Sequence, residues 1–374
     1  MLLALIYFYS FAFLSYIARD SIKIPEKRVR FETIGCFILL FGFMGFRDLP
    51  VLNDTAHYYE HFEDLLLGSE VSFSNIFRYD IYDRFSIGYQ IYERFIGAVF
   101  GHPYMIICVS ALITTISFLY FAKLHTEKVA LLIFMCLTTF MMDIYSGIRQ
   151  GLATCIFLFA LIFLERERTL VYYALVFLAY LFHPSAIILF ILPVLQRIPF
   201  NKMAILLTVV ATLAAIIGID YLVRITGLNE MDYFDYNKER ETLPIGSMLN
   251  SMVLLFFVVT AYKIKVSSSI KDNATISLFW WIALLDLFFS VLDSQFPILA
   301  RFCMYFNTVT FTLVLYYFSQ IKSLKTRRMI YTLVVCFLML RIGAVLVYRP
   351  EWYHFDPTAF YDFSIKVHNT RFGY

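Results

Sequence analysis

The sequence predicts an all-α, polytopic integral membrane protein with about twelve transmembrane or partly re-entrant helices. Hydrophobic residues make up 60% of the 374-residue chain, charged residues only 16%, and the mean hydropathy is +0.72. Apolar runs of membrane-spanning length recur along the whole chain, and basic residues gather in every second connection between them. Because no stretch is long and polar enough for a separate soluble domain, we expect residues 1–374 to form a single membrane domain.

The predicted spans follow from the apolar runs. The first run, MLLALIYFYSFAFLSYIARD, lacks a basic start and a small-residue cleavage site, so we expect a retained span rather than a signal peptide. Several later runs are shorter than the ~20 residues that cross a bilayer, which predicts tilted, broken or re-entrant helices. The spans are predicted at about 2–17, 32–46, 103–122, 129–146, 150–164, 169–182, 185–195, 203–223, 247–264, 274–293, 298–321 and 329–348.

The basic loops predict the orientation of these spans. Lysine and arginine are concentrated at 19–30, 123–128, 166–168, 197–202, 263–271 and 322–328. By the positive-inside rule these six connections are cytoplasmic, so both termini face outward. The outer parts are then the loop 47–102, the loop 224–246 and an aromatic C-terminal tail, 349–374.

The segment 85–101, FSIGYQIYERFIGAVFG, is apolar enough to insert, but a span here would invert everything after it. Glu93 and Arg94 also lie in its middle. We therefore expect an amphipathic helix that lies at the outer membrane interface, within the loop 47–102.

The stretch DIYSGIRQGLAT, residues 143–154, places Asp143, Arg149 and Gln150 between two apolar runs. A charged side chain at membrane depth costs several kcal/mol and is therefore rarely idle. The topology puts Arg149 on the outer side, in a tight break between two helices. Alternatively, Arg149 forms a purely structural ion pair with Asp143.

Three other outer segments carry polar residues. The first outer loop contains Arg47, Asp54, His57, Tyr58 and Tyr59. Arg47 is also explained as a helix-end arginine that extends to lipid headgroups, and Asp54 as the cap of a helix that begins near Ala56.

His183 precedes a proline, which predicts a kink rather than a smooth helix face. Arg301, Tyr305 and Asn307 lie at the outer start of a span. A lone histidine of this kind is more often a packing residue than a catalyst, and Arg301 is also explained as a headgroup contact.

Taken together, three arginines, one histidine and one aspartate from separate breaks fall on one side of the membrane. Arginine guanidinium groups match phosphate oxygens in a bidentate way and stay charged, so this pattern predicts a site for a lipid phosphate or pyrophosphate. No Asp, Glu, His or Cys cluster has metal-ligand spacing, so we expect neither a metal nor another cofactor. No basic cluster with interleaved aromatics predicts nucleic-acid binding.

Four segments resemble, in order, those of the EpsG-like polysaccharide polymerases, which are relatives of the Wzy-type O-antigen and capsule polymerases. They are FRDLPVLNDTAHYY, GIRQGLATCIFLFAL, YLFHPSAIIL and ARFCMYF, and the resemblance covers roughly residues 35–320. It implies a metal-independent membrane glycosyltransferase that acts on polyprenyl-diphosphate-linked oligosaccharide repeat units. It also implies a bacterial cell (inner) membrane, with the active face toward the periplasm or cell exterior. A chain-length regulator and a flippase are the partners that it implies.

With this chemistry, we expect Arg149 and Arg301 to grip the diphosphate, with Arg47 as a third arginine. Gln150, Tyr58 and Tyr305 are predicted to contact substrate, and the tyrosines of the loop and tail to stack on sugars. Asp54 and His183 are the two candidates for the general base, with Asp54 preferred for the base and His183 for polarisation or diphosphate contact.

Three alternative functions are weighed against the same residues. A ligase that passes the lipid-linked glycan to another acceptor would use the same arginines and histidine, and an acyltransferase of envelope sugars is a more distant alternative. A flippase or other transporter would be expected to show internal repeats and midplane charges. The charges here gather near one face, which favours an enzyme.

Overall fold

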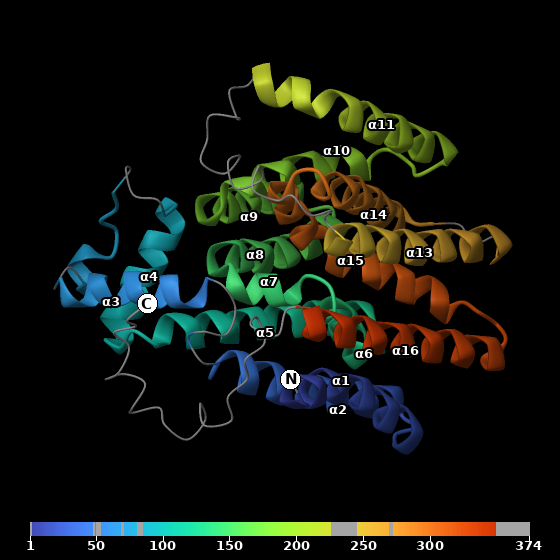
Figure 1. Cartoon of the computed structure of the whole chain (residues 1–374), viewed down its shortest axis with the longest axis horizontal. Coiled ribbons are helices and arrows are strands. Elements are labelled where there is room, and N and C mark those ends of the chain that lie inside the picture. The colour runs from blue at the N-terminus through green and yellow to red at the C-terminus, as the bar shows by residue number, and fades with distance from the viewer. Residues whose placement is uncertain are drawn as a thin grey trace. The chain divides into compact units, whose positions relative to one another are not determined.

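The protein is all-helical throughout the part that a computed structural model describes (Figure 1). These residues are 2–47, 49, 54–68, 71–80, 85–225, 245–268 and 272–348. Most of the predicted outer loop 224–246, all of the tail 349–374, and Asp48 and Asn53 of the first loop lie outside this part.

The chain divides into two compact units, and unit 1 is built from both ends of the chain. It comprises Met1–Ile187 and Arg328–Tyr374, whereas unit 2 comprises Ile188–Arg327. The last helix, α16 (Leu324–Tyr348), therefore belongs mostly to unit 1. The Tyr9 hydroxyl ties it to the first helix by donating a 3.1 Å hydrogen bond to the Met339 carbonyl.

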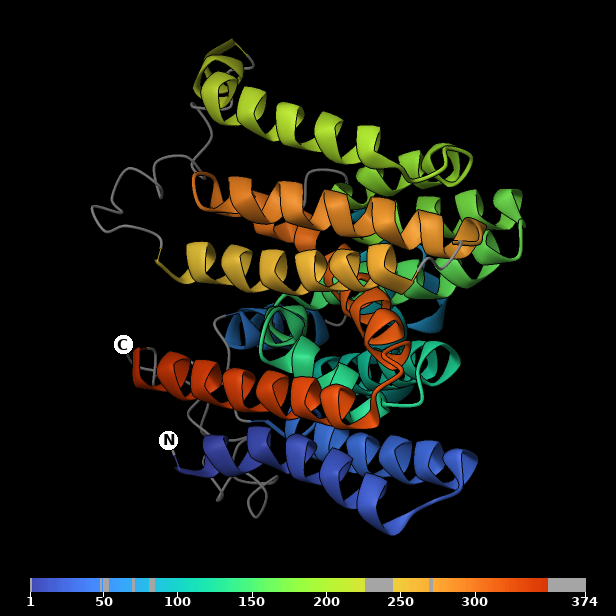
Figure 2. The ribbon, with the colours of Figure 1, turned by 90° about the vertical axis from the view of Figure 1, so that its right-hand side faces the viewer.

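Unit 1 contains long helices that match predicted spans, together with two shorter ones from the predicted outer loop. Figure 2 shows the first two helices, α1 and α2, running antiparallel and side by side. The elements are α1 (Leu2–Ser21), α2 (Pro25–Met44), α3 (Thr55–Leu67), the 3₁₀ turn η1 (Phe73–Asn75), α4 (Ile87–Phe100), α5 (Met105–His125), α6 (Val129–Leu137), α7 (Met141–Ser146), α8 (Ile148–Glu165) and α9 (Thr169–Phe182).

The run predicted as one span over 129–146 is broken into α6 and α7. The Thr138 and Thr139 hydroxyls both donate to the Met135 carbonyl, at 3.0 and 2.9 Å. Hydroxyls that bond back to the preceding turn compete with the backbone ladder and favour a bend. The short α7 then leads directly into α8 at Gly147.

Unit 2 consists of helices whose packing centres on α14. The elements are α10 (Leu192–Gln196), α11 (Lys202–Ile225), α13 (Ile245–Ser268), α14 (Ala274–Asp293), η4 (Pro297–Leu299) and α15 (Ala300–Ser319), and the 3₁₀ segment η2 (Pro184–Ile191) crosses the boundary between the units. Helix α14 packs against α10, α11, α13 and α15. Asn273 caps it, accepting a 2.8 Å hydrogen bond from the Ile276 amide.

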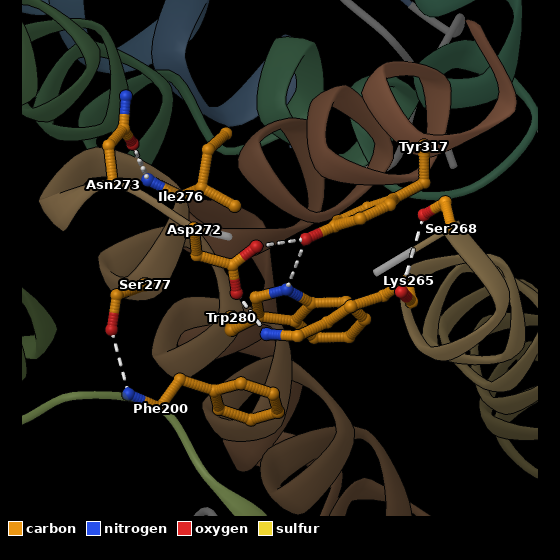
Figure 3. Close-up of polar contacts among 9 residues, drawn as sticks. All are labelled: Phe200, Lys265, Ser268, Asp272, Asn273, Ile276, Ser277, Trp280 and Tyr317. Atoms are coloured by element: carbon orange, nitrogen blue, oxygen red, sulfur yellow. Dashed lines mark hydrogen bonds and ion pairs between the residues drawn. The ribbon is translucent and has the colours of Figure 1, made fainter. Parts of the chain in front are cut away.

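One polar cluster joins the ends of three helices in unit 2 (Figure 3). Lys265 at the end of α13 forms an ion pair with Asp272, and its ammonium lies 4.6 Å from the centre of the Phe200 ring and 5.4 Å from that of Trp280. The Tyr317 hydroxyl of α15 donates to Asp272 at 2.5 Å and accepts from the Trp280 indole at 3.1 Å. These five residues, the Lys265 cluster, join the end of α13 and the residue that precedes Asn273, the cap of α14, to α15.

The helices confirm a membrane protein but not the exact number of crossings. Among the described residues, five helices are long and apolar enough to span a bilayer: α5, α8, α13, α14 and α16. Three shorter apolar helices lie at Thr169–Phe182, Pro184–Gln196 and Lys202–Gly218. The figure of twelve, and the single membrane domain over 1–374, remain predictions.

Helix α4 has the length expected of an interfacial helix, but its charged side chains are buried and its exposed side chains are apolar. At 14 residues it is shorter than the ~20 needed to cross a bilayer. Glu93 and Arg94 are buried, whereas Phe95, Val99 and Phe100 are exposed. The charges therefore face the protein interior and the apolar side faces outward.

Candidate active site

Helices α3 and α4 form an aromatic platform with α5 and α8 in unit 1. Gly88 of α4 lies directly against the backbone of Leu181, near the end of α9, where a side chain would collide. We call this set the α3–α4 cluster, and its buried members are Leu49, Tyr58, Tyr59, Phe62, Phe85, Tyr89, Ile96, Tyr104, Ile106, Ile107, Ile148 and Leu152. Of the site residues expected from sequence, Tyr58 is a member of this cluster and Arg149 is hydrogen-bonded to it.

Arg149 lies in the predicted break, in the first turn of α8. Gly151 permits this break, because a Cβ there would collide with the Ile144 carbonyl oxygen of α7. The half-buried guanidinium donates from Nε to the Tyr58 hydroxyl at 3.2 Å and lies 4.6 Å above the centre of the Phe85 ring. Arg149 is thus attached to the platform by one hydrogen bond and one cation–π contact.

Tyr58 lies between two charged groups. It is buried on α3, stacks on Phe85 with ring centroids 5.7 Å apart, and accepts the Arg149 hydrogen bond. Burial raises the pKa of the Tyr58 hydroxyl, the Arg149 guanidinium opposes this rise, and the negative charge of Asp54 adds to it. The Tyr58 amide also donates to the Asp54 carbonyl at 3.2 Å, so Asp54, Tyr58 and Arg149 are neighbours.

Asp54 occupies the cap position of α3, but its side chain makes no capping hydrogen bond. Its backbone amide instead donates to the Ser146 hydroxyl of α7 at 3.2 Å. The capping explanation therefore does not account for this aspartate. Its carboxylate precedes Tyr58 by four residues, one turn of α3, on the face that carries the Arg149 contact.

Arg47 is a buried connector. Its guanidinium donates to the Thr55 hydroxyl (3.1 Å), the Met44 carbonyl (2.8 Å) and the Tyr145 carbonyl (2.9 Å), which joins the end of α2 to α3 and α7. Its backbone carbonyl accepts from Tyr104 at 2.6 Å. Burial lowers the pKa of Arg47 to about 10, so the group is still charged at neutral pH. At 3% exposure it does not extend toward headgroups.

His183 lies at the predicted kink. Helix α9 ends at Phe182, His183 is extended, and η2 begins at Pro184. The Ser185 amide donates to Nδ1 of His183 at 3.3 Å, and the Ser185 hydroxyl contacts the same atom at 2.7 Å. Because an amide only donates, Nδ1 is the acceptor and Nε2 carries the proton.

The remaining predicted residues are distributed over both units. Gln150 is buried in the first turn of α8, next to Arg149. Arg301 and Tyr305 belong to unit 2, in the first two turns of α15, where Arg301 is half-buried and Tyr305 fully buried. The structure therefore brings Asp54, Tyr58 and Arg149 together, whereas the convergence of all three arginines remains a prediction.

Sequence reasoning did not assign three further residues of this region, Glu93, His61 and Phe85, to the site. Glu93, 1% exposed on α4, lies 3.3 Å from His61 Nε2 of α3. The His61 ring meets Phe85 edge-to-face, with centroids 4.3 Å apart. The available signal was the charge of Glu93 in a mainly apolar helix, because a buried carboxylate requires a partner.

A metal site is not built from the described residues: no three His, Cys, Asp or Glu side chains in these ranges are placed to hold an ion together. The charged groups that surround Tyr58 are instead a guanidinium and a carboxylate. Such a pair is suited to binding an anion on one side and accepting a proton on the other.

Comparison with known proteins gives one family. A family model described as the EpsG family matches residues 33–358, a range that contains all eight predicted site residues. No curated protein and no solved structure shows a significant match. Because the family model covers most of its length, the chain belongs to the EpsG family.

Proposed function

We propose that this protein is a polysaccharide polymerase that joins polyprenyl-diphosphate-linked repeat units at the outer leaflet of a bacterial membrane. Membership in the EpsG family supports a polymerase role. The observation that carries the chemical proposal is the position of Arg149, half-buried at a helix break and hydrogen-bonded to Tyr58 beside Asp54. A charge held this way suits a diphosphate that forms as a glycosidic bond breaks.

The proposed reaction is a single displacement. A hydroxyl oxygen of the incoming unit bonds to the anomeric carbon of the growing chain, and the bond from that carbon to the diphosphate oxygen breaks. The electron pair leaves with the diphosphate, whose new charge Arg149 stabilises. The hydroxyl proton passes to a base in the same site. Because guanidinium groups neutralise the leaving group, the reaction is expected to proceed without a metal.

The same site would serve a ligase, and the product distinguishes the two functions. In a deletion host that carries Arg149→Ala, a polymerase predicts surface glycan reduced to a single repeat unit that still reaches the surface. A flippase predicts loss of that single unit as well. A ligase predicts that the polymer still forms but is not attached to its acceptor.

Arg166→Ala provides the matched control, because Arg166 is exposed at the opposite end of the same helix. Membrane levels of both variants are compared with wild type. A full glycan ladder with Arg149→Ala, at equal protein level, would contradict the diphosphate role and return Arg149 to a structural role. Loss of the ladder in both variants would show that the assay responds to α8 in general.

A further inference from the structure

Helix α3 presents a third polar residue on the face that carries Asp54 and Tyr58. His61 follows Tyr58 by three residues and Asp54 by seven, which is the spacing of side chains that share one helix face. His57 on the same helix is exposed, whereas His61 is part-buried with a side chain 23% exposed. His61 is therefore the histidine of α3 that faces the α3–α4 cluster while remaining accessible.

Glu93 orients this histidine. Its carboxylate, 1% exposed, lies with Oε1 at 3.3 Å from Nε2 of His61. An ionised carboxylate only accepts hydrogen bonds, and a neutral imidazole has one donor and one acceptor nitrogen. Nε2 therefore carries the proton, and Nδ1 presents its lone pair away from Glu93.

The His61–Glu93 pair places two polar side chains between α3 and α4, where apolar side chains would pack equally well. One turn further along, α3 and α4 meet through Phe62 and Leu66, which pack against Gly97. A buried carboxylate in such an interface carries a desolvation cost that an apolar side chain would avoid. Helix packing alone does not explain a buried glutamate and histidine at this position.

The Phe85 ring places His61 beside the proposed diphosphate site. The His61 imidazole meets this ring edge-to-face at 4.3 Å, and the Arg149 guanidinium lies over the same ring at 4.6 Å. An imidazole and a guanidinium on one aromatic ring can contact neighbouring parts of a single glycosyl diphosphate.

The two histidines also differ in the nitrogen that remains to accept a proton. Nδ1 of His183 already accepts from the Ser185 amide. No described residue forms a hydrogen bond with Nδ1 of His61, whose ring contacts Glu93 through Nε2. A proton acceptor requires an accessible lone pair, and the His61 side chain is 23% exposed.

We propose that His61, oriented by Glu93, is the catalytic base that takes the proton of the acceptor hydroxyl. This rests on the polymerase function proposed above. As the hydroxyl oxygen bonds to the anomeric carbon, its proton moves to Nδ1 of His61 and the carbon–diphosphate bond breaks. Glu93 then stabilises the imidazolium, and Arg149 stabilises the departing diphosphate. Glu93 is a positioning residue in this scheme.

The test uses the full-length protein in membranes of a deletion host, with lipid-linked repeat units extracted from that host as the probe. His61→Ala is expected to lower kcat by about 100-fold or more, the range of general-base catalysis, with KM changed less than about threefold. Added imidazole is expected to restore part of this rate, because the small base can occupy the vacated space. Glu93→Gln, which keeps the shape of the side chain, is expected to lower kcat by about tenfold.

His57→Ala is the matched control, since it removes an exposed histidine from the same helix, and it is expected to behave as wild type. If His61→Ala does not accumulate, His61→Gln replaces it, and the same loss of kcat is expected. A wild-type rate in His61→Ala would overturn the proposal. A loss of rate that imidazole does not restore, together with complete loss of turnover in Asp54→Ala, would also overturn it and would assign the base to Asp54. Failure of wild-type protein to elongate the probe would instead reject the polymerase function itself.

Discussion

The Arg149 guanidinium and the Tyr58 hydroxyl are joined by a 3.2 Å hydrogen bond, although the two residues are 91 positions apart in the chain. The contact connects the first turn of α8 to the first turn of α3, and Phe85 contacts both side chains. The contact holds the half-buried positive charge of Arg149 beside an aromatic ring.

Tyr58→Phe is expected to lower the polymerisation rate by about tenfold while the protein remains folded. The substitution removes the acceptor for Arg149 Nε but keeps the ring that stacks on Phe85. A hydrogen bond to a charged group contributes about 1.5–3 kcal/mol, and part of this orients the guanidinium. The rate is measured with lipid-linked repeat units, with Tyr120→Phe, an exposed tyrosine of α5, as control. An unchanged kcat would show that the contact does not orient Arg149 for catalysis.

Arg47→Ala is expected to destabilise unit 1 by about 2–4 kcal/mol. The change leaves the Met44 and Tyr145 carbonyls and the Thr55 hydroxyl without their buried donor. Arg47→Lys is expected to recover only part of the loss, because an ammonium cannot match three separately directed partners. Thermal unfolding in detergent measures both, and Arg30→Ala, an exposed arginine of α2, serves as control. A Tm equal to wild type would mean that Arg47 does not join these helices.

Gly151→Ala is expected to reduce the amount of folded protein strongly. The added Cβ would collide with the Ile144 carbonyl, so α7 and α8 would have to move apart and displace Arg149. Gly42→Ala in α2 is the opposite case, since its Cβ would meet no atom within 4 Å. Removing a helical glycine there is expected to stabilise by about 0.5–1 kcal/mol. Fluorescence-detected size exclusion and thermal unfolding compare the two, and equal behaviour would contradict the close approach.

Lys265→Met and Asp272→Asn are each expected to lower the Tm, and the double variant is expected to lower it less than the sum of the two. The Lys265 side chain is 18% exposed and that of Asp272 9%, so neither charge is well solvated without its partner. Coupling energies of about 0.5–3 kcal/mol are typical of such contacts. Lys263→Met removes an exposed lysine from the same helix as control. Additive effects in the double-mutant cycle would exclude a coupled pair.

Local sequence signals predicted many of the helices and two of the breaks. Pro184 predicted that α9 ends before His183, because the ring of a proline excludes the preceding residue from helical geometry. The glycines of SGIRQG accompany the break before Arg149. The break between α6 and α7 was missed, because Thr138 and Thr139 lie in an apolar run with no glycine or proline.

The candidate site could be predicted only in part. Arg149 and Tyr58 were identified because polar residues near a predicted outer face are conspicuous in an apolar sequence. Neither the burial of Arg47 nor its three partners could be deduced, since a helix-end arginine can equally extend to headgroups. His61 was missed because the sequence offers no reason to prefer it over His57, four residues earlier, until α4 covers one face of α3.

The sequence by itself determined that this is a membrane protein, where most of its helices lie and which segments carry charge. These properties depend on hydropathy and on local steric rules, which act over a few neighbouring residues. Only the tertiary structure decided which charges meet: that Arg149 contacts Tyr58, that Glu93 faces His61, and that Phe85 lies between them. The physical reason is that contacts between helices depend on how each helix is rotated and packed against its neighbours, and no local pattern of residues specifies that rotation.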